Sequence, residues 1–177
     1  MLYLSHYASP LGELLLAARE ETLVGVWFLG QAHFPAQFSE PTVTQQTSVL
    51  EQTARWLDRY FDGEAPNGAE LPLAPEGSNF SKRVWEQLQQ IPYGQTVTYG
   101  DIARVLSAEQ DGKRASARAV GGAVGRNPIS ICIPCHRVLG GSHRLTGYAG
   151  GVARKAALLT LEQAKTPDGA KTTWISE

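Results

Sequence analysis

Residues 131–141, ICIPCHRVLGG, contain the side chains most able to do chemistry in this 177-residue chain. Cys132, Cys135 and His136 form the pattern C-x-x-C-H, which is typical of thiol–disulfide exchange and of c-type haem attachment. Together with His143, the same residues could provide the four ligands of a structural zinc ion. A further hypothesis is one reactive cysteine that is assisted by the neighbouring histidine.

The residues around the two cysteines predict a different structural setting for each of them. Residues 129–133 alternate isoleucine with serine and cysteine, which predicts a β-strand that stops at Pro134. Cys132 would then pack on the strand, as a free cysteine usually does, whereas Cys135 would lie in the glycine-rich loop after it. A redox cysteine normally begins a helix, and the spacing matches no common zinc pattern. These residues favour a single reactive thiol at Cys135, and the redox, haem and zinc hypotheses stay open as alternatives.

A reactive thiol needs a partner that takes its proton. His136 could do so directly or through a water, and a third group usually orients such a base. The candidate is Glu162, which lies at the end of the predicted helix VARKAALLTLEQ, on its apolar stripe with Leu158 and Leu159. A carboxylate in that position needs a polar partner. The sequence therefore predicts a Cys–His–Glu site.

The N-terminal part is predicted to form a small antiparallel sheet with one helix. Segments rich in β-branched and aromatic residues favour strands, and an apolar residue every three to four positions favours an amphipathic helix. These segments are strands at residues 2–7, 13–18 and 22–29 and a helix at 48–61. Residues 63–78, rich in proline and glycine, are typical of a linker. We therefore expect an N-terminal α/β domain with its linker at 1–77 and a second domain at 78–177.

The second half is predicted to be mostly helical, which makes the fold class α/β (α+β) with a winged-helix-like C-terminal domain. One helix begins near Ser78, another at the capping sequence Thr98-Tyr99-Gly100-Asp101, and a third covers 116–125. The last two are typical of a helix-turn-helix. The third helix consists mainly of alanine and glycine, so a partner can approach its backbone closely. Arg118 is its one long cationic side chain.

Charge is distributed unevenly along the chain. Residues 1–80 include three basic and ten acidic side chains, a net charge of −7, whereas residues 81–165 include twelve basic and five acidic ones, a net charge of +7. A basic half indicates a polyanionic partner. No apolar run is long enough to span a membrane, and the N-terminus lacks the positively charged start of a signal peptide. We therefore expect a cytoplasmic protein that does not bind a membrane.

Three stretches of the second half resemble the O6-alkylguanine-DNA alkyltransferases, which are DNA repair proteins that act once. They are IPYGQTVTYGDIA, ARAVGGAVGRNPISICIPCHRV and GYAGG…RKAALLTLE, within residues 80–163. The family's Pro-Cys-His-Arg-Val hallmark is intact from Pro134 to Val138. The resemblance implies that the alkyl group of O6-methylguanine, or of O4-methylthymine as a second candidate lesion, moves irreversibly to Cys135. Such a methylated-DNA–protein-cysteine methyltransferase would need no cofactor and no metal.

The resemblance also implies roles for residues outside the cysteine motif. Tyr99 would help rotate the damaged nucleotide and give a proton to the leaving guanine, and Asn127 would tie the helix-turn-helix to the active-site loop. The small-residue helix would enter the minor groove of double-stranded DNA, with Arg118 in the place of the flipped base. The remaining DNA-binding candidates are Ala119, Gly122, Lys113 and Arg114, and the candidates for the wall of the lesion pocket are Pro134, Val138, Tyr148, Ala149 and Gly150.

Two other functions stay open. One is a sensor that binds alkylated DNA without repairing it, and the other is a cytosolic redox protein that uses Cys132 and Cys135. The chain also departs from the family pattern, because the connection at 107–116 is longer than usual and Cys132 stands where an aliphatic residue is common. Some relatives have a zinc site in the N-terminal domain, which this chain cannot build because its first cysteine is Cys132.

Overall fold

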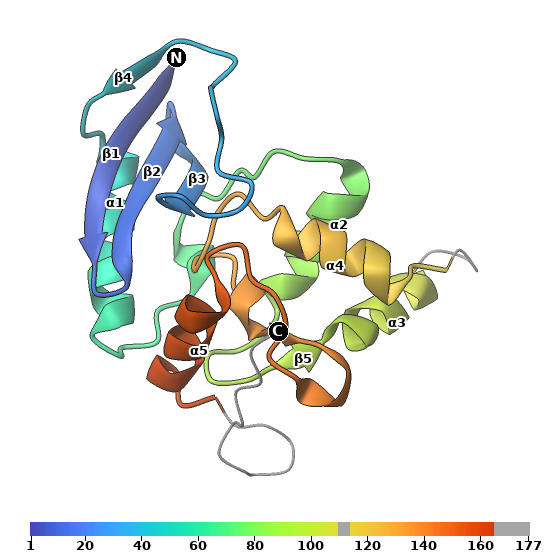
Figure 1. Ribbon diagram of the computed structural model, residues 1–177. Coiled ribbons are helices and arrows are strands. Elements are labelled where there is room, and N and C mark those ends of the chain that lie inside the picture. The colour runs from blue at the N-terminus through green and yellow to red at the C-terminus, as the bar shows by residue number, and fades with distance from the viewer. Residues whose placement is uncertain (110–113, 165–177) are drawn as a thin grey trace.

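The computed structural model of the protein describes residues 1–109 and 114–164. A β-sheet with one helix packed on it lies at one end of the molecule, and most of the other helices lie at the opposite end (Figure 1). Along the chain the elements are β1 (Leu2–Ser9), β2 (Gly12–Arg19), β3 (Thr22–Phe28), β4 (Thr42–Thr44), α1 (Ser48–Phe61), a 3-10 helix (Gly68–Glu70), α2 (Asn79–Leu88), β5 (Val97–Thr98), α3 (Tyr99–Glu109), α4 (Ala117–Gly125), a 3-10 helix (Cys135–Arg137), β6 (Val138–Leu139), a 3-10 helix (Gly141–His143) and α5 (Val152–Leu161). This order confirms the predicted fold class.

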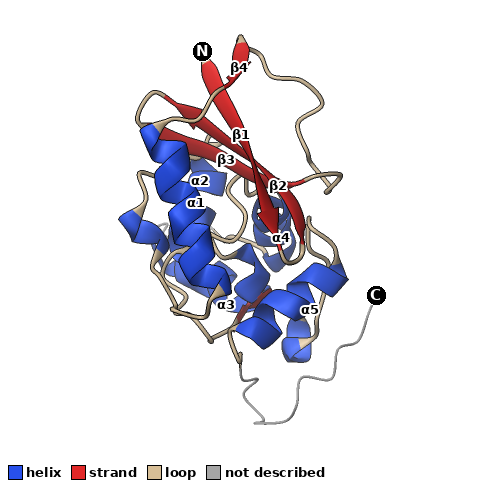
Figure 2. Ribbon diagram, turned by 90° about the vertical axis from the view of Figure 1, so that its left-hand side faces the viewer, coloured by secondary structure: helices blue, strands red, loops and turns tan. Residues whose placement is uncertain are grey.

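The sheet has the strand order β3-β2-β1-β4. β1, β2 and β3 pair antiparallel, as predicted, and β4 adds to β1 in parallel. β4 was not predicted because it is three residues long and mostly exposed. α1 packs across the sheet (Figure 2). Its first turn is capped by Thr47, whose hydroxyl accepts a hydrogen bond from the amide of Leu50, and the predicted helix at 48–61 is confirmed.

Residues 63–78, predicted as a linker, pack against the rest of the protein. Leu73 forms a parallel bridge with Leu23 of β3, so this segment extends the edge of the sheet. Gly68 approaches the active-site segment so closely that a methyl group on its Cα would overlap the carbonyl oxygen of Cys132. The N-terminal half therefore rests directly on the segment that contains both cysteines.

The helices of the second half begin close to the predicted positions. Ser78 and Ser116 cap α2 and α4, each by accepting a hydrogen bond from a backbone amide. Thr98 and Asp101 form reciprocal side-chain to backbone hydrogen bonds at the start of α3. α3 and α4, the two helices of the predicted helix-turn-helix, pack against each other and against α2.

The predicted strand at 129–133 is wrong. The segment runs through consecutive turns after Ile129, which forms a β-bridge with Val26 of β3. Ile131 has a φ of 70°, a left-handed conformation that does not occur in a regular strand. The alternation of residue types was misleading because every residue from 129 to 140 is buried. Alternating polarity therefore did not mark an exposed face.

One buried cluster joins the two ends of the molecule. It includes Phe28 of the sheet, Leu57 of α1, Trp85 of α2 and Leu158 of α5. Because burial of apolar surface is the main stabilising force in folding, the sheet and the helices stabilise each other. The boundary expected after residue 77 stays a prediction. Within residues 1–109 and 114–164, no helix is long and apolar enough to cross a membrane.

Candidate active site

Cys135 begins a 3-10 helix after the turn segment and borders a cavity of about 320 Å³. Other parts of the second half form the walls of the same cavity. They are α3 through Tyr99, α4 through its glycines, and the loop before α5 through Tyr148 and Ala149. Two of the predicted pocket residues, Tyr148 and Ala149, and the predicted Tyr99 therefore lie around one space with the cysteine.

The N-terminal half also reaches this cavity. Ala32 and His33, in the loop after β3, line it, and the amide of Ala32 donates to the carbonyl of Ala149 at 2.9 Å. Arg154 of α5 makes a second connection, because its guanidinium donates to a carbonyl of the β1–β2 turn at 2.9 Å and to the carbonyl of Gly150 at 3.2 Å. This part of the wall is therefore held in place by both halves of the chain.

Cys135 is almost fully buried, with 4% of the residue's surface exposed. Burial raises the pKa of Cys135, and the nearby Asn127 and Lys155 oppose this effect without cancelling it. The thiol is therefore protonated at neutral pH. Because the thiolate is the nucleophile, the reaction needs a base that removes this proton.

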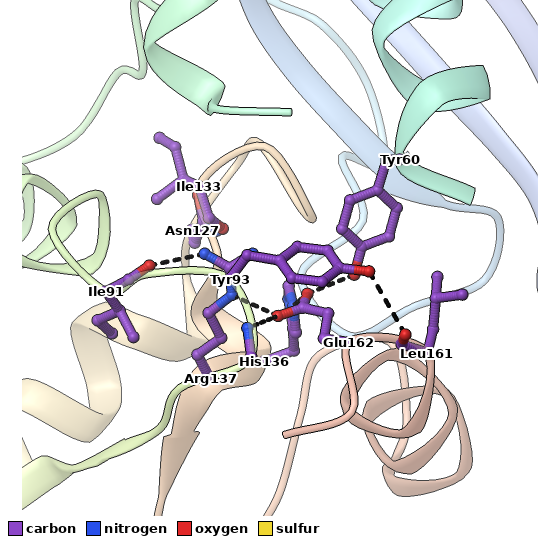
Figure 3. Close-up of polar contacts among 10 residues, drawn as sticks. Tyr60, Ile91, Tyr93, Asn127, Ile133, His136, Arg137, Leu161 and Glu162 are labelled. Atoms are coloured by element: carbon purple, nitrogen blue, oxygen red, sulfur yellow. Dashed lines mark hydrogen bonds and ion pairs between the residues drawn. The ribbon is translucent and has the colours of Figure 1, made fainter. Parts of the chain in front are cut away.

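His136, the residue after Cys135, is the candidate for that base. Its Nε2 lies 2.5 Å from Oε2 of Glu162, and both side chains are fully buried (Figure 3). Because an ionised carboxylate only accepts hydrogen bonds, Nε2 must hold the hydrogen, and Nδ1 keeps the lone pair. Nδ1 is buried and has no hydrogen-bond partner among the described residues. Burial lowers the pKa of His136 despite the neighbouring carboxylate, so the imidazole is neutral and able to accept a proton.

Glu162 is the centre of a buried polar network. His136 and the hydroxyl of Tyr60 share its Oε2, each at 2.5 Å, while Nε of Arg137 donates to Oε1 at 2.7 Å and the amide of Gly94 donates to Oε1 at 3.2 Å. Burial alone would raise the pKa of Glu162. The positive charge of Arg137 and the hydrogen bonds from His136 and Arg137 outweigh it, so the pKa lies well below its usual range. Glu162 is therefore ionised and orients His136.

Asn127 follows α4 and fixes the turn segment before Cys135. Its side-chain amide donates to the carbonyl of Ile133 at 2.8 Å, and its side-chain oxygen accepts from the amide of Ile129 at 3.0 Å. Both contacts are buried. They connect the end of α4 to the residues that lead into Cys135, which is the connection that the resemblance implied for this asparagine.

Three residues predicted to line the pocket lie beside it instead. Pro134 borders a separate hollow on the side of Trp56. Val138 is fully buried in β6, and Gly150 lies against the ring of Phe28. None of the three is among the residues that line the cavity of Cys135, and their place in the lesion pocket stays a prediction.

The residues predicted to bind DNA gather on the outer side of α4. Arg118 is exposed, and together with Ala119 and Gly122 it lines an open hollow between α4 and the start of α2. Arg114 is exposed just before α4. The predicted Lys113 lies outside the described residues. α4 thus presents glycines to the cavity of Cys135 on one side and a cation to solvent on the other.

Three side chains of the site were not predicted, namely Tyr60, Arg137 and Lys155. Arg137 stands inside the cysteine motif, and its place next to His136 was the available signal. Lys155 is fully buried on α5 and donates to two loop carbonyls at 3.3 Å. Its position three residues before Leu158, on the apolar stripe of the predicted helix, was the available signal. Tyr60 lies 102 residues before Glu162, and no spacing in the sequence connects them.

The alternative uses of the cysteine motif gain no support from the geometry. Both thiols are free and buried, and burial raises the pKa of Cys132 far above its usual value. A thiol in that state is a poor nucleophile for disulfide exchange. Among residues 1–109 and 114–164, no three His, Cys, Asp or Glu side chains are placed to hold a metal ion.

The fold and the site define a class of protein in which a sheet and a helical part together hold one cysteine beside a buried histidine–carboxylate pair. Residues 79–164 match the family described as 6-O-methylguanine DNA methyltransferase, DNA binding domain. Residues 2–75 match the ribonuclease-like domain of the same family. This chain belongs to the 6-O-methylguanine DNA methyltransferase family.

Relatives with assigned names are similar in sequence to this chain over nearly its whole length. The methylated-DNA–protein-cysteine methyltransferase of Haemophilus influenzae is 39% identical over 92% of this chain and 87% of its own length. The protein of the same name from Mycolicibacterium paratuberculosis is 43% identical over 90% and 91%. The crystal structure of Mycobacterium tuberculosis OGT in complex with DNA matches with a TM-score of 0.79 and 39% identity, over 91% of this chain and 92% of that one.

Proposed function

We propose that the protein repairs DNA directly by moving the alkyl group from O6 of guanine to Cys135, once per molecule. The observation that carries this proposal is a buried thiol beside a neutral histidine, which a carboxylate orients, next to a cavity bordered by α4. The names of the relatives, which are methylated-DNA–protein-cysteine methyltransferases, support the same activity. The Cys–His–Glu arrangement provides what a single displacement on an alkyl carbon requires.

In this reaction His136 accepts the thiol proton on Nδ1, directly or through a water. The sulfur of Cys135 then attacks the alkyl carbon, and the bond between that carbon and guanine O6 breaks with its electrons remaining on the guanine. Tyr99, which lines the same cavity, gives the departing guanine a proton. The product is a thioether on Cys135, which no group of the site can reverse, so the protein is consumed.

The substrate of this proposal is double-stranded DNA whose damaged base is turned out of the helix. α4 would lie in the minor groove because its small residues allow close approach, and Arg118 would fill the gap left by the base. The exposure of Arg118 and the hollow that it shares with Ala119 and Gly122 support this docking. The net charge of residues 81–165 supports binding to phosphates that weakens with salt. A cytoplasmic location stays a prediction.

Mass spectrometry after mixing with a duplex that contains O6-methylguanine tests the proposal. We expect one added CH2 on the peptide that contains Cys135, no adduct in Cys135→Ala, and a normal adduct in the matched control Cys132→Ala. Loss of the adduct in both variants would favour the redox pair. Binding of the duplex without an adduct in the wild-type protein would favour the sensor. Arg118→Ala should slow reaction with the duplex more than reaction with free O6-benzylguanine, and equal slowing would contradict the docking.

A further inference from the structure

The N-terminal half contributes a polar group to the catalytic network through Tyr60. This residue lies near the end of α1 and is fully buried. Its ring stacks on Trp56, with centroids 5.7 Å apart, and meets the ring of His136 edge to face, with centroids 6.4 Å apart. Figure 3 shows the hydroxyl of Tyr60 directed at the carboxylate of Glu162. Packing alone would be served equally well by phenylalanine, whose ring has the same shape.

The hydroxyl has a specific acceptor, which is the same oxygen that holds His136. Tyr60 donates to Oε2 of Glu162 at 2.5 Å, and Nε2 of His136 lies 2.5 Å from that oxygen. The other oxygen, Oε1, is occupied by Arg137 and the amide of Gly94. Tyr60 and His136 therefore compete for the electron density of one oxygen.

We propose that Tyr60 is a positioning residue of the transfer reaction, because its hydroxyl shares Oε2 of Glu162 with His136 and so limits how strongly the carboxylate attracts a proton to the imidazole. This inference rests on the proposed function, since it concerns the base that serves Cys135. Charge-assisted hydrogen bonds are the strong ones in proteins. Two donors on one carboxylate oxygen draw on the same negative charge, so each bond is weaker than it would be alone. Through Tyr60, the helix that covers the sheet adjusts a base in the other half of the molecule.

Other charged and titratable groups also face this network. They come from the 3-10 helix at 135–137, the turn before β5, the loop before α5, and α5 itself. These groups are Cys135, Arg137, Tyr93, Tyr148 and Lys155. Arg137 and Lys155 both lower the pKa of His136, and Glu162 raises it. Removal of the Tyr60 hydroxyl strengthens the interaction between Glu162 and His136, so it shifts the pKa of His136 upward.

The test is the pH dependence of Cys135 alkylation by free O6-benzylguanine, followed by intact mass from pH 5 to 9. The acid limb of the rate profile is the pH range in which the rate falls as His136 becomes protonated. In Tyr60→Phe this limb should move to higher pH by about half a pKa unit or more, where one unit corresponds to about 1.4 kcal/mol of differential interaction. Tyr93→Phe is the matched control, because its hydroxyl donates to a backbone carbonyl at 3.4 Å and does not touch Glu162. An unmoved acid limb in Tyr60→Phe, or an equal shift in Tyr93→Phe, overturns the inference.

A second variant covers the case in which Tyr60→Phe does not fold. 3-Fluorotyrosine at position 60 keeps the ring and makes the hydroxyl a stronger donor, so the acid limb should move to lower pH. A merely structural role predicts no shift of either sign. If the wild-type protein forms no adduct at all, the proposed function fails. If it forms the adduct and neither variant moves the acid limb, only the inference on Tyr60 fails.

Discussion

Replacement of Glu162 by glutamine tests whether the buried carboxylate holds the active site together. The carboxylate accepts four hydrogen bonds, two on each oxygen, and its side chain is completely buried. An amide has one oxygen that can accept two of these bonds, and its NH2 group then faces two donors. Whichever way the amide is turned, either Tyr60 and His136 or Arg137 and Gly94 lose their acceptor.

The magnitude follows from these lost partners. An unsatisfied buried donor costs about 1–3 kcal/mol, more when it is charged, and removal of one member of a buried ion pair costs about 3–5 kcal/mol. We therefore expect Glu162→Gln to lower the free energy of unfolding by about 4 kcal/mol at pH 7. For a urea dependence of about 2 kcal/mol/M, the midpoint of unfolding falls by about 2 M. This is a large part of the stability of an average protein of this size.

Urea unfolding followed by circular dichroism measures this loss. Glu70→Gln is the matched control, because Glu70 forms a 2.8 Å ion pair with Arg59 in which both side chains are 45% exposed. Water replaces the lost contact there, so the midpoint should stay close to that of the wild type. A midpoint of Glu162→Gln within the error of Glu70→Gln would refute the view that the carboxylate organises its four donors.

Two further predictions concern the segment around Cys135. Gly68→Ala places a methyl group on the carbonyl of Cys132, so it should cost about 1–3 kcal/mol in urea unfolding and slow alkylation by free O6-benzylguanine, whereas in Gly141→Ala the added methyl meets no atom within 4 Å and should change neither. Because burial lowers the pKa of His136, the neutral base persists below its ordinary pKa of about 6.5. The wild-type alkylation rate should therefore fall to half below pH 6.5, and a half-maximal rate at or above that pH would contradict the protonation state assigned to His136.

The sequence was sufficient for elements whose signals are local. The helix starts at Ser78 and Thr98 and the periodicity of α1 each depend on residues within one or two turns, and all were predicted correctly. The contact between His136 and Glu162 could also be predicted, because a carboxylate on an apolar stripe needs a partner and the cysteine motif supplies one. The role of this pair toward Cys135 stays a prediction.

The features that could not be predicted depend on contacts between distant segments. Residues 129–133 alternate like a strand, yet β3 and the surrounding core bury both of their sides, so the alternation had no meaning for exposure. Tyr60 and Glu162 meet only because α1 and the end of α5 converge in three dimensions. The approach of Gly68 to Cys132 likewise depends on how the segment after α1 folds back, which neither proline nor glycine content reveals.

One part of the cavity wall comes from a segment that contributes no group to the proposed reaction. Ala32 and His33 are exposed residues of the loop after β3, while the cysteine, the histidine and the carboxylate are buried in the other half. Surface loops tolerate substitution and changes of length far better than buried segments do. Substitutions in this loop can therefore change one part of the cavity wall while the buried cysteine, histidine and carboxylate stay the same.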